Sequence, residues 1–158
     1  EIQLIKNYVE LEKSRFGVDL DVSLTFTGDI EGKLIRPLLL LPLLENSFKH
    51  GTGDQLDQKW ISLDLNVEKN MMHFKLANSR DHEWDNKEMS INEKGISLEN
   101  VKRRLELLYP EEHNLVIKEE PDLFLVKLDL KLKRDVNVKS HNSLSETKTH
   151  DLEMPTGR

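Results

Sequence analysis

The residues whose types and spacing are best suited to chemistry lie in one short segment, residues 42–51. In a helix, four polar side chains of this segment would fall within an arc of about 140°: Glu45, Asn46, Lys49 and His50. An amide oxygen is a hard ligand suited to Mg²⁺, and an ammonium and an imidazole pair with phosphate oxygens. A carboxylate beside them could orient or deprotonate a nucleophile. The segment thus suggests a site for a metal-bound polyphosphate, although periodicity alone favours a solvated polar helix face.

The composition excludes several other classes of protein. The 158 residues contain no cysteine, which excludes a disulfide framework and a thiolate metal site. The 23 Lys and Arg and 29 Asp and Glu give a formal net charge of −6, which argues against a general nucleic-acid binder. No Walker loop, Ser/His/Asp order or paired-carboxylate pattern stands out. The longest apolar run, residues 38–44, is interrupted by Pro42 and falls far short of the ~18 residues of a membrane helix.

The elements that must position the polar segment follow from clean apolar periodicities. Helical spacing predicts helices over residues 1–15 and 42–50, and a third from about Gly95 to just before Pro110. Alternation predicts five strands, over residues 18–26, 61–67, 72–76, 115–118 and 124–132. Residues 79–94 form a long polar loop in this interpretation. One apolar face per strand and three amphipathic helices predict an α+β fold, a two-layer sandwich with three helices on one face of a mixed or antiparallel sheet.

Three segments are expected along the chain. Residues 1–16 form a leading helix that Gly17 ends, and residues 17–133 form the main domain. Residues 134–158 contain too few apolar side chains to offset their ordering entropy and are expected to be a disordered tail. The chain begins at Glu1, within what reads as a helix, and without Met, so we expect it to be a fragment of a longer protein.

Three motifs resemble those of the GHKL ATPase superfamily, and specifically of the LytS-like sensor histidine kinases. Residues 39–51, Leu-Leu-Leu-Pro-Leu-Leu-Glu-Asn-Ser-Phe-Lys-His-Gly, resemble the N box. Residues 95–110, which begin Gly-Ile-Ser-Leu-Glu-Asn and continue to Arg-Leu, resemble the second glycine box and its helix. Residues 8–16, Tyr-Val-Glu-Leu-Glu-Lys-Ser-Arg-Phe, resemble the helix that precedes the ATP domain in these kinases. All three occur in the order found in the family.

The resemblance implies the Bergerat ATP-binding fold and assigns roles by position. Asn46 would ligate Mg²⁺, Glu45 would occupy the general-base or orienting position, and Lys49 and His50 would face the phosphates of ATP. Residues 79–94 would be the ATP lid. The nucleotide-binding positions in the second glycine box would be Gly95, Ile96, Ser97, Leu98 and Asn100, with backbone amides at the start of a helix meeting the triphosphate.

The resemblance also implies a reaction and partners. The full-length protein would transfer the γ-phosphoryl group of Mg-ATP to a histidine in its own dimerisation region, and then to an aspartate of a response regulator. We therefore expect the full-length protein to be a homodimer anchored in a membrane. This segment would be its cytoplasmic part and would contact neither membrane nor nucleic acid. The phosphoacceptor segment of the family, Pro-His-Phe-Leu-like, is not in this sequence, so we expect the fragment to be unable to phosphorylate itself.

The sequence departs from the family at two places. Ser97 stands where the second glycine box usually has Gly, and Asn78 stands where an Asp reads adenine, with no recognisable first glycine box around it. The amide oxygen of Asn78 could still accept a hydrogen bond from the adenine amino group. Two alternatives stay open: a degenerate GHKL module that binds partners without catalysis, and a GHKL serine kinase.

Overall fold

The structure, a computed structural model, describes residues 1–51, 58–80 and 91–134, with the backbone alone for Val18 and residues 91–97. Its first half contains α1 (Ile2–Phe16), the 3₁₀ turn η1 (Gly17–Asp19), β1 (Leu20–Gly28), β2 (Lys33–Leu34) and α2 (Leu41–Gly51). The second half contains β3 (Lys59–Glu68), β4 (Met71–Ser79), α3 (Ile91–Leu108), β5 (His113–Glu119), β6 (Leu123–Lys131) and β7 (Lys133–Arg134). No helix among these residues is long and apolar enough to cross a membrane.

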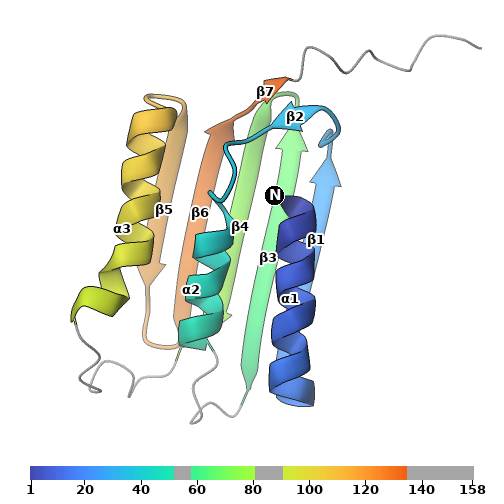
Figure 1. Ribbon diagram of the computed structural model, residues 1–158, viewed down its shortest axis with the longest axis vertical. Helices are drawn as coiled ribbons and strands as arrows, with labels where there is room; N and C mark the ends of the chain where they lie inside the picture. The colour runs from blue at the N-terminus through green and yellow to red at the C-terminus, as the bar shows by residue number, and fades with distance from the viewer. Residues whose placement is uncertain (52–57, 81–90, 135–158) are drawn as a thin grey trace, which may run out of the picture.

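The main sheet has five strands in the order β1-β3-β4-β6-β5. β1 pairs with β3 in parallel, and the other three pairings are antiparallel, so the sheet is mixed. The three helices lie on one face of this sheet, with α2 between α1 and α3 (Figure 1). This arrangement confirms the predicted two-layer α+β sandwich.

The core lies between the helices and the sheet because apolar side chains alternate along each strand. The register places Leu63 of β3 opposite Leu76 of β4, and Leu76 opposite Val126 of β6. All three are fully buried. Leu43 and Leu44 of α2 are also fully buried, so the N-terminal half of this helix packs firmly on the core.

Three features differ from the sequence-based expectations. The first strand begins at Leu20, because residues 17–19 form a 3₁₀ turn. This turn begins at Gly17, whose φ of 65° favours glycine. The third helix begins at Ile91, four residues before the predicted start at Gly95, so residues 91–94 are helical and not part of a loop. The short pair β2 and β7 was not predicted, because two-residue strands carry no periodicity.

Two predicted segments fall largely outside the described residues. Of the predicted lid, residues 81–90 are not described, while Ser79 ends β4. Of the predicted tail, residues 135–158 are not described, while Arg134 pairs with Lys33 in the β2–β7 ladder.

The fold brings one end of each of three elements, α2, β4 and α3, to the same edge of the molecule. The C-terminal end of α2, the C-terminal end of β4 and the N-terminal end of α3 lie at the same end of the sheet, opposite β2 and β7 (Figure 1). These three elements carry the predicted site residues: Glu45, Asn46, Lys49 and His50 on α2, Asn78 on β4, and Gly95, Ile96, Ser97, Leu98 and Asn100 on α3.

Candidate functional site

Helix α2 divides its four predicted site residues between protein interior and solvent. Asn46 is 7% exposed and counts among the few buried polar residues. Glu45 and Lys49 are exposed, and His50 is half-buried. The four side chains that periodicity places within one arc of the helix are therefore not all exposed. Asn46 lies on the face of α2 that packs against the protein, and Glu45 and Lys49 lie on the face that meets solvent. A buried amide and exposed charges next to one another can serve a metal and a solvated phosphate chain, respectively.

The side of α2 that carries Glu45 faces helix α1. The ring of Tyr8 in α1 packs edge-on against Phe48, with 5.5 Å between the ring centroids. Burial, above all, raises the pKa of Tyr8 to about 12, and the negative charges of Glu12 and Glu45 contribute in the same direction. Glu45 therefore lies within electrostatic reach of the Tyr8 hydroxyl. The periodicity of the two helices does not indicate that Tyr8 and Glu45 are neighbours.

Asn78 is the predicted base-reading residue, and its side chain is fully buried. Its Nδ2 donates to the carbonyl oxygen of Ser79 at 2.7 Å. Its Oδ1 has no hydrogen-bond partner among the described residues. A buried acceptor without a donor carries a desolvation penalty that a bound donor would relieve. Asn78 therefore offers an amide oxygen to a ligand that brings an N–H group, which suits the exocyclic amino group of adenine.

The end of α2 is fixed tightly against Asn78. A Cβ atom on Gly51 would lie 2.8 Å from Nδ2 of Asn78 and 2.9 Å from its Cβ. Only glycine allows this approach of helix and strand. The hydroxyl of Ser79 donates to the Gly51 carbonyl at 3.0 Å and accepts the Trp60 N–H at 3.0 Å, so α2, β3 and β4 are joined at one point.

Two serines near this contact, Ser79 and Ser47, were not predicted as part of the site from the sequence. Ser79 was assigned to a loop, yet it ends β4 and holds α2 to the sheet. Ser47 has a fully buried hydroxyl, and its Oγ, like Asn78 Oδ1, has no partner in the described part of the chain. Ser47 lies one helical turn before Gly51, on the same face of α2. A small polar residue between Asn46 and Phe48 was the signal in the sequence that could have indicated it.

The site residues predicted on α3 are placed less completely. Leu98 is half-buried against the core, and Asn100 is exposed. For Gly95, Ile96 and Ser97 the structure describes the backbone alone. Because α3 begins at Ile91, the amides of residues 95–98 come after its first turn and pair within the helix. The prediction that these amides open the helix is therefore wrong for this structure.

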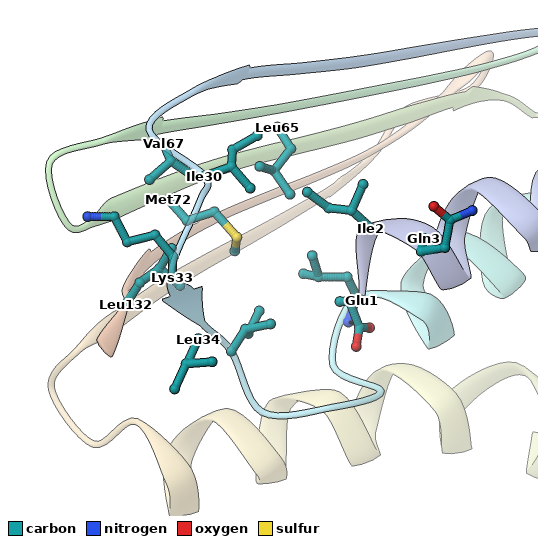
Figure 2. Close-up of a pocket in the computed structure, with 12 residues that line it drawn as sticks. Glu1, Ile2, Gln3, Ile30, Lys33, Leu34, Leu65, Val67, Met72 and Leu132 are labelled. Carbon is teal, nitrogen blue, oxygen red and sulfur yellow. Dashed lines mark hydrogen bonds between the residues drawn. The ribbon is translucent and has the colours of Figure 1, made fainter. Parts of the chain in front are cut away.

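A separate pocket lies at the opposite end of the molecule. Its volume is about 290 Å³, and its walls are mostly apolar side chains from β2, β3 and the start of α1. Figure 2 shows Ile2, Ile30, Leu65 and Met72 around this space. None of the described residues that line this pocket is a predicted site residue.

Comparisons with known proteins point to one fold. No model of a known protein family matches the chain. Among curated proteins, it is 28% identical over 127 residues to YwpD, an uncharacterized protein of Bacillus subtilis (strain 168). It is 24% identical over 127 residues to the sensor histidine kinase BtsS of Escherichia coli (strain K12). These alignments cover 77% and 78% of this chain, and 45% and 21% of the relatives, so the chain spans less than half of either protein.

Solved structures with a similar backbone include two histidine kinases. The histidine kinase domain of the Erythrobacter litoralis EL346 blue-light activated histidine kinase gives a TM-score of 0.56 at 13% identity, covering 80% of this chain and 58% of that one. The mycobacterial sensor histidine kinase MprB gives 0.56 at 15% identity, covering 85% and 95%. The chain therefore has the α+β fold of histidine kinase catalytic domains, with three helices on one face of a mixed five-stranded sheet.

Proposed function

We propose that this chain is the ATP-binding catalytic domain of a sensor histidine kinase of the LytS-like type. The observation that carries the proposal is the buried Oδ1 of Asn78 beside the end of helix α2, which has no hydrogen-bond partner among the residues that the structure describes. In a domain with this fold, such an acceptor fits the amino group of an adenine base. The sequence similarity to BtsS supports the same assignment.

The residues of α2 supply the other half of the proposed site. The amide oxygen of Asn46 would ligate Mg²⁺, and Lys49 and His50 would neutralise phosphate oxygens. Glu45 would orient the attacking imidazole or accept its proton. Bound Mg-ATP supplies the γ-phosphoryl group, and the chain contributes positioning and charge neutralisation.

The acceptor and partners in this proposal lie outside the chain. The phosphoryl group would pass to a histidine in a dimerisation region of the longer protein and then to an aspartate of a response regulator. The longer protein would be a homodimer, with this domain in the cytoplasm.

Calorimetric titration of the chain with ATP tests the proposal directly. With Mg²⁺ present, we expect binding that weakens at least about tenfold in Asn46→Ala, because one metal ligand is lost. The difference in affinity between Mg²⁺ and EDTA should disappear in that variant. Asn114→Ala, which truncates an exposed asparagine of β5, is the matched control and should bind like the parent. Equal affinity of Asn46→Ala and the parent would contradict the metal assignment.

One observation favours a second candidate, a GHKL module that binds a partner and no nucleotide. The amides of residues 95–98 pair inside α3, which removes donors that a triphosphate would need. Absence of any binding of Mg-ATP at millimolar concentration would support this module in place of the kinase domain.

A further inference from the structure

The segment that leads into α2, residues 36–41, is held by the side chain of Glu1, the residue that precedes helix α1. Oε2 of Glu1 accepts the Leu38 N–H at 2.7 Å. Oε1 accepts the N–H groups of Leu40 and Leu41 at 2.9 and 3.1 Å. Amides at the start of a helix have no partner within it, so a carboxylate here also meets the positive end of the helix dipole. Glu1 immediately precedes α1 and lies beside this segment (Figure 2), so its carboxylate caps α2 from outside that helix.

The same segment is held from the other side by residues of α3 and the turn after it. The guanidinium of Arg104 donates from Nη2 to the Pro37 carbonyl at 2.7 Å and from Nη1 to the Leu38 carbonyl. The hydroxyl of Tyr109, which is buried, accepts the Arg36 N–H at 2.8 Å. The planar fork of an arginine suits two neighbouring acceptors, which a single ammonium group matches less well.

The backbone of this segment needs such support. Leu38 has a φ of 56°, in the left-handed region that a leucine adopts only at a cost in energy. Its side chain is 48% exposed, so burial of the leucine offsets little of that cost. Strained backbone persists where the surroundings hold it, and the bonds from Glu1 and Arg104 do so on both sides of Leu38.

We propose that Glu1 and Arg104 are positioning residues that together fix the start of α2 relative to α1 and α3. α2 carries Glu45 and Asn46, so the orientation of both would depend on two side chains at the other end of the helix. The consequence for nucleotide binding rests on the proposed function, whereas the holding of residues 36–41 does not.

Hydrogen exchange of backbone amides by NMR tests the first part. In Arg104→Ala, we expect exchange at Leu40 and Leu41 to accelerate about tenfold, although Arg104 touches neither amide. Exchange in β3 and β4 should stay as in the parent. Arg104→Lys should recover part of the protection. Arg103→Ala, which truncates the exposed neighbouring arginine, is the matched control and should change nothing.

Replacing the other partner tests whether the two residues act together. In Glu1→Gln an N–H₂ group replaces one acceptor, so the same amides should exchange faster, whereas Glu10→Gln on the exposed face of α1 should have no effect. If Glu1 and Arg104 hold one segment, the double variant should exchange about as fast as the faster single variant. If the double variant instead accelerated exchange by the product of the two single accelerations, Glu1 and Arg104 would act independently, and the proposal would be overturned.

Nucleotide affinity tests the consequence for the site. Arg104→Ala should weaken binding of Mg-ATP several-fold, with Arg104→Lys in between and Arg103→Ala unchanged. Accelerated exchange throughout the chain would mean general destabilisation and would overturn a positioning role, as would unchanged exchange at Leu40 and Leu41. If the parent chain binds no Mg-ATP, the proposed function fails, while the exchange measurements still decide whether Glu1 and Arg104 hold the segment.

Discussion

At the scale of single residues, burial separates side chains that look equivalent in the sequence. Glu45 and Asn46 are neighbours in the chain, yet Glu45 is exposed and Asn46 is 7% exposed. Asn78 is fully buried and keeps one amide oxygen without a partner in the described part of the chain. In the described part of the chain, the buried side-chain polar atoms without a hydrogen-bond partner are Asn78 Oδ1 and Ser47 Oγ. The charged side chains of Glu45 and Lys49, in contrast, lie where solvent reaches them.

Changing Asn78 should alter nucleotide affinity without altering its dependence on magnesium. Asn78→Ala removes the acceptor that we propose for the adenine amino group, and we expect binding of Mg-ATP to weaken about tenfold. In Asn78→Asp a charged acceptor forms a stronger hydrogen bond, so affinity should be retained or increased. Calorimetry with ATP and GTP provides the measurement. Equal affinity of Asn78→Ala and the parent would contradict the base-reading role.

The titration of Tyr8 reports how close Glu45 lies to α1. Its pKa is raised from 10.0 to about 12, and a negative neighbour disfavours the phenolate. Glu45→Gln should therefore lower the pKa of Tyr8, and Glu10→Gln should not. The absorbance of the phenolate, taken as the difference between each protein and its Tyr8→Phe counterpart, gives the pKa. An unchanged value in Glu45→Gln would place Glu45 away from Tyr8.

The same raised pKa has a consequence for stability at high pH. The folded chain holds the Tyr8 proton more tightly than the unfolded chain, so this stabilisation is complete below pH 10.0 and is lost as the pH rises toward about 12. Because Tyr8 is half-exposed, we expect the loss to be about 1 kcal/mol. Urea unfolding of the parent and of Tyr8→Phe at pH 10 and at about pH 12 measures this loss. If the free energy of unfolding changed equally with pH in the two proteins, the stabilisation by the Tyr8 proton would be contradicted.

At the scale of elements, the contact between α2 and β4 decides whether the site residues meet. Gly51 allows the helix to approach Asn78, and Ser79 bonds to the Gly51 carbonyl from the next position of β4. The start of α2 is held separately, by Glu1 and Arg104. Both ends of this helix are therefore fixed by side chains of other elements, as a site built on a rigid element requires.

Gly51→Ala should disturb both stability and binding. The added methyl group would lie 2.8 Å from Asn78 Nδ2, and overpacking of this kind costs about 1–3 kcal/mol, partly offset by the higher helix propensity of alanine. We also expect weaker binding of Mg-ATP, because Asn78 must shift. Gly17→Ala, where no atom lies within 4 Å of the added methyl, is the control and should reduce stability through its positive φ alone. Unchanged affinity in Gly51→Ala would argue against this contact as part of the site.

At the scale of the whole molecule, the fold depends on one apolar layer between three helices and the sheet. The opposite sheet face carries polar pairs such as His73 and Asp129, which are both partly exposed. The distance from Nδ1 of His73 to Oδ1 of Asp129 is 2.7 Å. Exposed pairs of this kind contribute little to stability. Burial of the helices on the other face therefore supplies most of the stabilisation.

Two leucines of α3 provide a matched test of that statement. Leu105 is fully buried, and Leu107 is 70% exposed. Leu105→Ala should lower the free energy of unfolding by about 2–5 kcal/mol, because it removes buried contacts and leaves a cavity. Leu107→Ala should change it by less than about 0.5 kcal/mol. Urea unfolding measures both, and similar losses would show that α3 packs with a different face toward the sheet.

The sequence by itself determined the types of the main elements, their order and the segment that carries the candidate site. Periodicity is a local property, so the bounds of α1, α2 and the β3–β4 hairpin could be predicted within a few residues. The N-box resemblance located Asn46 and its neighbours for the same reason, since it rests on a contiguous stretch of chain.

Only the tertiary structure decided how distant parts of the chain meet. The parallel pairing of β1 with β3, the contact of Gly51 with Asn78 and the bonds from Glu1 and Arg104 to residues 36–41 all join segments that are far apart in sequence. Such contacts depend on how helices pack on the sheet, and hydrophobic packing is not directional enough to be deduced from one strand or helix alone. Packing also fixed the buried position of Asn46 and left Oδ1 of Asn78 without a donor among residues 1–51, 58–80 and 91–134.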